Sequence, residues 1–114
     1  MMDVLNQTQI DRLAKEIGAE NVPVLLKIFL GELSEYSEKL RNDESLDRDH
    51  YLKEISHALK SSAASFGAER LRAYSVEIDA FAKSGQVLNV TEMSDKMIVI
   101  LDQTRERYQD ALAD

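Results

Sequence analysis

The residue with the clearest chemical potential is a histidine on the solvent-facing side of a predicted helix. Apolar and small residues recur there at three- and four-residue spacing, and the buried stripe they predict is Leu52, Ile55, Leu59, Ser62/Ala63 and Phe66. At about 100° per residue, His57 lies about 200° from both Ile55 and Leu59. We therefore expect its imidazole to point into solvent, where another molecule can reach it.

The surroundings of His57 favour phosphorus chemistry. A neutral imidazole is a usable nucleophile for phosphorus near neutral pH, because its unperturbed pKa is about 6.5. Lys60 follows His57 by three residues and Lys53 precedes it by one turn, so both ammonium groups can attract the oxygens of a phosphoryl group. The alternatives that remain at this point are an exposed His57 without a chemical role and a Lys60 that is an ordinary solvated lysine.

A metal site is the second chemistry that this helix suggests. His50, Glu54 and His57 form a stripe, and Glu54 and His57 have the Glu-x-x-His spacing of di-iron helical bundles. Those motifs project into the bundle interior, whereas this one faces outward, and the chain has no second pair. We therefore predict no metal site.

Serine chemistry is also disfavoured. No histidine is placed to activate Ser61, Ser62 or Ser65, so we expect structural roles for all three. Ser62 lies on the inward stripe, where its hydroxyl is expected to bond a backbone carbonyl one turn earlier. The chain also lacks a glycine-rich phosphate loop, so it has no visible means of taking a phosphoryl group from ATP.

Composition excludes several other classes of protein. Fourteen basic against 21 acidic residues give a net charge of −7, which opposes binding to nucleic acid. There is no cysteine, which fits the cytoplasm, and no apolar run approaches the roughly 20 residues of a membrane span. Residues 1–4 lack the basic stretch and apolar run of a signal peptide. We expect a cytoplasmic protein that neither spans nor binds a membrane.

Glycine is scarce, with four residues, and there is one proline, so strands and tight hairpins are not expected. The periodicity instead predicts five helices, over residues 6–17, 21–41, 47 or 49 to 67, 69–83, and 89 or 91 to 112. The connections are short, so successive long helices should be antiparallel neighbours. The prediction is one all-α domain over residues 1–114, an antiparallel up-down four-helix bundle with a short N-terminal helix covering one end.

Local signals refine the second and fifth helices. Asn21 is a good N-cap for the second helix, with Pro23 in its first turn. Gly31 inside that helix costs roughly 1 kcal/mol relative to alanine. Met93 and Met97 lie on the inward stripe of the last helix, where we expect core packing and not a binding surface.

The run His57-Ala58-Leu59-Lys60-Ser61-Ser62-Ala63-Ala64-Ser65-Phe66-Gly67 resembles the signature of histidine-containing phosphotransfer (HPt) domains. That signature is His-x-Leu-Lys-Gly-Ser-(Ser/Ala), followed by an apolar residue and glycine. Ser61 stands where the broader pattern usually has glycine. The stretches 21–26 and 51–57 carry a closer likeness to the quorum-sensing phosphorelay members of the family.

The resemblance implies that His57 accepts a phosphoryl group from the receiver-domain aspartate of a hybrid sensor kinase and passes it to a response regulator, assisted by Lys60. It implies no cofactor of the chain's own, with Mg²⁺ in the partner receiver domain, and a monomeric phosphocarrier rather than an enzyme. The expected docking face comprises Lys53, Glu54, Ser61, Ala64 and Gly67. The alternative is a helical interaction module that binds a signalling partner without phosphotransfer.

Overall fold

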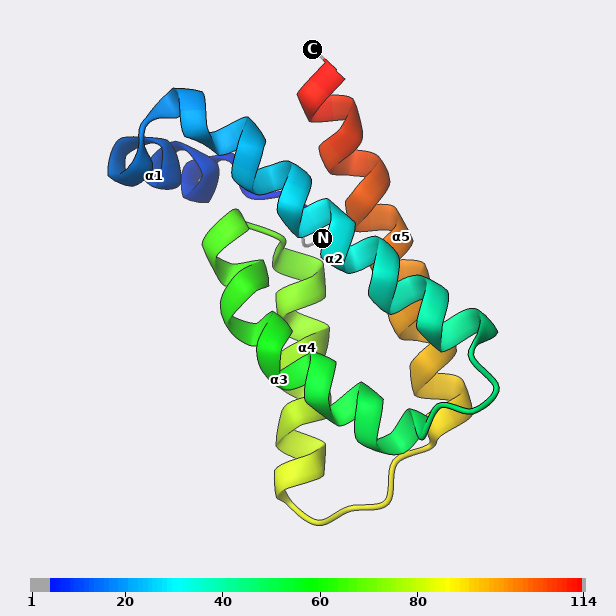
Figure 1. Ribbon diagram of the computed structural model, residues 1–114. Helices are drawn as coiled ribbons and strands as arrows, with labels where there is room; N and C mark the ends of the chain where they lie inside the picture. Colours follow the sequence, from blue (N-terminus) through cyan, green and yellow to red (C-terminus); the bar gives the residue numbers. More distant parts are fainter. Residues whose placement is uncertain (1–4, 114) are drawn as a thin grey trace.

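The computed structural model describes residues 5–113, and these form only helices, turns and loops. The elements are α1 (Gln7–Ile17), a short 3₁₀ helix η1 (Ala19–Asn21), α2 (Val22–Asn42), α3 (Arg48–Phe66), α4 (Glu69–Lys83) and α5 (Val90–Ala113) (Figure 1). The all-α class is confirmed, and the strict up-down order stays a prediction. The segment 1–4, from which we expect no signal peptide, lies outside the described residues.

Side-chain caps explain three of the helix starts. The Asn6 side-chain oxygen accepts a hydrogen bond from the Thr8 amide at 3.0 Å, before α1. Asp47 accepts one from the His50 amide at 3.2 Å, before α3. Asn89 accepts one from the Glu92 amide at 3.3 Å, before α5. Each cap satisfies an amide that has no partner inside its helix, so these helices begin within two residues of where the sequence predicts.

The start of α2 differs from the prediction. Asn21 closes the 3₁₀ turn η1 with helical backbone angles, and its side chain makes no capping hydrogen bond to α2. The side-chain Nδ2 of Asn21 instead donates to the Ile17 carbonyl at 2.7 Å. Asn21 therefore occupies the predicted N-cap position of α2, but its side chain does not cap that helix, because it satisfies a carbonyl at the end of α1. Pro23 does lie in the first turn of α2.

The helices pack as two pairs that share one core. α3 and α4 make the most extensive contact and α2 and α5 the next, while α1 lies against α3 and the start of α2 (Figure 1). The Phe29 and Phe66 rings stack with centroids 4.6 Å apart, and the Tyr108 hydroxyl donates to the Phe66 carbonyl at 2.6 Å. These contacts fix the C-terminal end of α3 against α2 and α5. Met97 is fully buried and Met93 half-buried, so the core prediction for both methionines holds.

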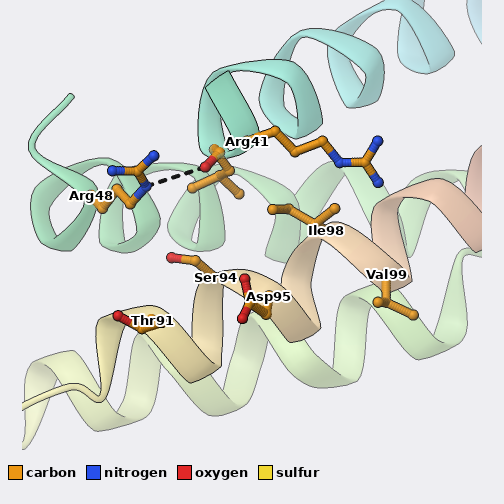
Figure 2. A pocket seen from close by; sticks show the side chains of 8 residues that line it. Arg41, Arg48, Thr91, Ser94, Asp95, Ile98 and Val99 are labelled. Carbon is orange, nitrogen blue, oxygen red and sulfur yellow. Dashed lines mark hydrogen bonds between the residues drawn. The ribbon is translucent and has the colours of Figure 1, made fainter. Parts of the chain in front are cut away.

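The N-terminal end of α3 and the C-terminal end of α2 both line a surface hollow of about 540 Å³. The Arg48 Nε donates to the Leu40 carbonyl at 3.2 Å and so links the two ends of the α2–α3 connection. The dashed line from Arg48 in Figure 2 marks this bond. The lining residues are Leu40, Arg41, Arg48, Thr91, Ser94, Asp95, Ile98 and Val99.

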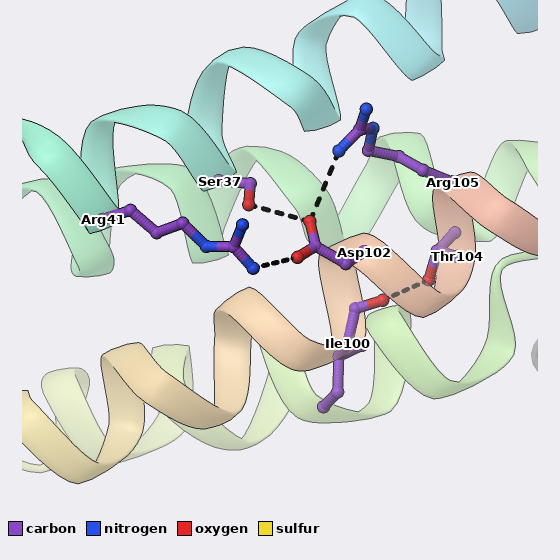
Figure 3. A network of polar contacts seen from close by, with 6 residues as sticks. All are labelled: Ser37, Arg41, Ile100, Asp102, Thr104 and Arg105. Carbon is purple, nitrogen blue, oxygen red and sulfur yellow. Dashed lines mark hydrogen bonds and ion pairs between the residues drawn. The ribbon is translucent and has the colours of Figure 1, made fainter.

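A polar network joins α2 to α5 next to this hollow. Asp102 accepts a hydrogen bond from the Ser37 hydroxyl at 2.8 Å and forms ion pairs with Arg41 and Arg105 (Figure 3). Its carboxylate is three-quarters buried, and two arginines compensate its negative charge. The network is a structural link between α2 and α5.

No helix in residues 5–113 has both the length and the apolar character needed to cross a membrane.

We predict that Gly67→Ala destabilises the protein by about 2 kcal/mol or more, measured by urea unfolding. Gly67 ends α3 with φ of 74°, and an added Cβ would lie 2.5 Å from the Asn6 carbonyl oxygen. The matched control is Gly31→Ala, which places a Cβ with no atom within 4 Å in the middle of α2. This control should stabilise by about 0.5–1 kcal/mol. Equal unfolding free energies for the two variants would contradict the account of Gly67.

Candidate functional site

The structure places His57 on the outer face of α3, with its side chain 67% exposed. One ring nitrogen, Nδ1, lies 3.3 Å from Oδ1 of Asp79 on α4. The other, Nε2, makes no hydrogen bond to any residue between 5 and 113. The sequence prediction of an outward histidine is confirmed, and the ring has one tethered edge and one edge open to solvent.

Two lysines share the carboxylate that contacts His57. Lys60 Nζ lies 2.6 Å from Asp79 Oδ2, and Lys83 Nζ lies 2.9 Å from the same oxygen. Lys60 is only 29% exposed. It is therefore a paired, partly buried cation that links α3 to α4, and the alternative of an ordinary solvated lysine is wrong.

The charges of this cluster reinforce one another. Hydrogen bonds from Lys60, then Lys83 and His57, hold the pKa of Asp79 far below its ordinary value, although partial burial opposes the shift. The bond to Asp79 in turn raises the pKa of Lys83. Asp79 is therefore ionised and Lys83 protonated at neutral pH. With His57 neutral, the cluster has one net positive charge on a chain whose net charge is −7.

Small residues are buried where α3 and α4 face each other. Ser56 lies one turn before Lys60, and Ser75 lies one turn before Asp79, so both serines occupy the faces that α3 and α4 turn toward each other. Both are fully buried. Short side chains at these positions allow the close approach that brings Asp79 to His57.

Two further predicted residues pair within α3 itself. Lys53 Nζ lies 3.0 Å from Asp49 Oδ2, and Glu54 Oε2 lies 3.5 Å from His50 Nε2. Both pairs are exposed or half-exposed on the same helix as His57. Among residues 5–113, no three His, Cys, Asp or Glu side chains are grouped closely enough to hold a metal ion.

The remaining positions of the expected docking face divide into two kinds. Ser61 is exposed one turn after His57, and Ala64 is half-buried beside a groove between α1 and α3. Gly67 is buried, because Asn6 donates its backbone amide to the Gly67 carbonyl at 2.6 Å and covers it. The prediction that Gly67 lies on the exposed docking face is therefore wrong. Ser62 donates to the Ala58 carbonyl at 3.4 Å, as expected.

Sequence reasoning missed Asp79 and Lys83. A signal for Asp79 was present, since it follows Ile78 and lies four residues after Ser75, on the flank of the inward stripe of α4. A carboxylate beside a buried stripe needs a partner. The sequence did not reveal which one, because it does not show how α3 and α4 align.

The comparisons with known proteins agree with this geometry. The family model described as Hpt domain matches residues 24–113. The chain belongs to the Hpt domain family. This Hpt domain is similar to the phosphorelay protein LuxU of Vibrio cholerae serotype O1, with 56% identity over 110 residues, covering 96% of this chain and 97% of the relative.

Two more relatives carry the same description. The phosphorelay protein LuxU of Vibrio vulnificus (strain YJ016) is 53% identical over 107 residues, 94% of this chain and 93% of the relative. That of Vibrio harveyi is 50% identical over 107 residues, 94% of each chain. No significant match was found among solved structures.

We predict that the stabilising effect of Asp79 is lost in acid. Its pKa is lowered in the folded state, whereas an unfolded aspartate has a pKa of about 3.9, so the stabilisation is complete above that value. It declines as the pH falls below about 4 toward the folded-state value. Urea unfolding of the wild type and Asp79→Asn at pH 6 and pH 2.5 tests this. The difference between them should shrink at pH 2.5, and an unchanged difference would contradict the ion-pair account.

Proposed function

We propose that this Hpt domain is the histidine phosphotransfer protein of a multistep quorum-sensing phosphorelay, with His57 as phosphoryl acceptor and donor. The observation that carries the proposal is the open Nε2 edge of an exposed imidazole whose other edge contacts a carboxylate paired with Lys60. The similarity to LuxU phosphorelay proteins supports the quorum-sensing assignment.

The chemistry needs little beyond positioning. The Nε2 lone pair attacks the phosphorus of an aspartyl phosphate in the donor receiver domain. The N–P bond forms as the P–O bond to that aspartate breaks, and the carboxylate leaves. The reverse sequence delivers the phosphoryl group to a second receiver. No general base is needed, because a neutral imidazole already has an unprotonated nitrogen. Lys60 offsets the negative charge of the transferred group.

The proposed partners rest on the likeness to LuxU phosphorelay proteins. The donors are receiver domains of hybrid sensor histidine kinases, and the acceptor is a LuxO-type response regulator. Mg²⁺ is supplied by the receiver, and the chain acts as a phosphocarrier that needs neither an ATP site nor a cofactor of its own. It works as a cytoplasmic monomer that binds neither nucleic acid nor membranes.

The docking face surrounds His57 on α3. Ser61 is exposed one turn beyond it, and Ala64 lies at the edge of the α1–α3 groove. Lys53 and Glu54 lie one turn before it. Gly67 is not part of this face because it is buried. Short side chains beyond His57 allow a receiver to bring its aspartate to the ring.

We predict that His57→Gln abolishes phosphate acceptance from a phosphorylated receiver domain and changes stability by less than about 0.5 kcal/mol, since the site is exposed. Acid-labile, alkali-stable phosphate on the chain is the readout. His50→Gln is the matched control and should keep full acceptance, because the Nε2 of His50 faces the Glu54 carboxylate and is not open as in His57. Receiver binding with no phosphate on the wild type would establish the interaction-module alternative instead.

A second prediction concerns docking. Ser61→Trp should strongly reduce transfer from receiver domains, because the large ring blocks the approach to His57. Acceptance from phosphoramidate should fall much less, since so small a donor needs no broad surface. Val99→Trp, at an exposed site on α5, is the control. If transfer from the receiver survives Ser61→Trp, the receiver approaches over another face.

A further inference from the structure

A groove between α2 and α5 has no part in the site around His57. Its volume is about 530 Å³, and it is lined by two neutral polar side chains together with Lys27, Leu30, Gly31, Arg105 and Leu112. All the lining residues belong to α2 and α5, whereas His57 and its contacts belong to α3 and α4. We infer that this groove, with the exposed face of α2 beside it, is a docking surface for an acidic amphipathic helix of a partner protein. The inference goes beyond the proposed function and does not depend on it.

Gly31 is a residue of α2 that the fold itself does not explain. Glycine inside a helix is disfavoured relative to alanine, because it loses more backbone freedom on folding. Gly31 does not have the left-handed φ that favours glycine, and a Cβ added to it would meet no atom within 4 Å. Neither the backbone nor the packing of residues 5–113 therefore requires glycine here. The missing side chain does allow the backbone of another molecule to approach α2 closely at this point.

The face of α2 around Gly31 is apolar and open to solvent. Val24 and Ile28 lie one turn apart, and each is 57% exposed. Ile28 precedes Gly31 by three residues, so all three lie on one face of the helix. In the adjoining groove, Leu30 is buried and Leu112 is half-buried. Single exposed apolar side chains are ordinary on a protein surface, but a row of them beside a groove with a polar rim is typical of an interaction site.

The charge in the groove is positive. Lys27 and Arg105 contribute to the lining from opposite sides, and no acidic residue does. Lys27 is exposed and forms no ion pair within residues 5–113. Arg105 makes one long contact, from Nη1 to Asp102 Oδ1 at 3.4 Å, and its Nε has no hydrogen-bond partner in the described part of the chain. Both cations therefore have donors left for a carboxylate of a partner.

The net charge of −7 does not prevent an acidic partner from binding here. At physiological ionic strength, exposed charges more than about 8 Å apart are largely screened from one another. The carboxylates of a ligand in the groove therefore interact mainly with Lys27 and Arg105.

The shape of the surface favours a helix as the occupant. A groove between two helices takes the apolar face of a third, whereas an extended peptide needs an open sheet edge, and residues 5–113 contain no strand. Residues 24–34 of α2 span about 15 Å, which matches about three turns of a partner helix. The apolar residues of that helix would contact the open face of α2, and its carboxylates would contact Lys27 and Arg105.

A synthetic peptide tests this surface on the wild-type chain. The probe is a helical peptide of about four turns, with leucines on one face and glutamates on both flanks. One matched peptide has lysine in place of glutamate, and another has serine in place of leucine. In ¹⁵N–¹H NMR we expect the acidic peptide to bind with a Kd of about 0.1 mM or tighter, and each matched peptide at least about tenfold more weakly. The amide signals of residues 24–34 and 105–112 should shift, and those around His57 should not.

Two variants locate the bound peptide. Gly31→Leu should weaken binding of the acidic peptide at least about tenfold by filling the groove, and Lys27→Glu at least about fivefold by reversing a charge. Both positions are exposed, so circular dichroism should show the wild-type helical content. Lys15→Glu makes the same change of charge on α1, outside the groove, and should bind like the wild type. Wild-type affinity in Gly31→Leu or in Lys27→Glu overturns the inference.

Other occupants of the surface give different results. A second copy of this chain would shift the signals of residues 24–34 as the protein concentration rises, without any peptide. An anionic membrane would show as binding to phosphatidylglycerol vesicles that Lys27→Glu weakens. Either result in place of selective binding of the acidic peptide, or equal binding of the three peptides, overturns the inference. Phosphorylation by phosphoramidate is a separate readout, in which Gly31→Leu should accept phosphate on His57 at the wild-type rate, so failure of the docking surface and failure of the proposed function are distinguishable.

Discussion

The ionised carboxylate of Asp79, held between α3 and α4, is the contact on which the candidate site depends. Its Oδ1 lies against the His57 ring, and its Oδ2 binds Lys60 and Lys83. The carboxylate is 9% exposed, so it would be costly there without these cations. Stability and reactivity are therefore coupled at this point, because the bonds that allow Asp79 to be buried also hold the groups that would act on phosphate.

The rest of the fold holds α3 and α4 so that Asp79 stays beside His57. Ser56 and Ser75 are fully buried one turn before Lys60 and Asp79, so the two helices meet there through short side chains. At the end of α3, Tyr108 bonds the Phe66 carbonyl and Asn6 bonds the Gly67 carbonyl. These bonds fix the rotation of α3 about its own axis, and hence the direction in which His57 points.

The sequence predicted the features that depend on local periodicity and failed on those that depend on contacts between helices. His57 faces outward as expected, because the positions of Leu52, Ile55 and Leu59 define the opposite face. The partnership of Asp79 with His57 was not predictable, since the axial alignment of α3 with α4 is set by packing. Gly67 was misplaced for the same reason, because the residue that covers it comes from before α1.

The account's central claim is tested most directly by locating the phosphoryl group after transfer from a phosphorylated receiver domain. ³¹P–¹⁵N coupling in the ¹⁵N-labelled chain identifies the nitrogen, and His50, also exposed on α3, serves as an internal comparison. The account predicts a single N–P bond, at Nε2 of His57. A phosphoryl group on Nδ1 of His57, or equal labelling of His50, would contradict it.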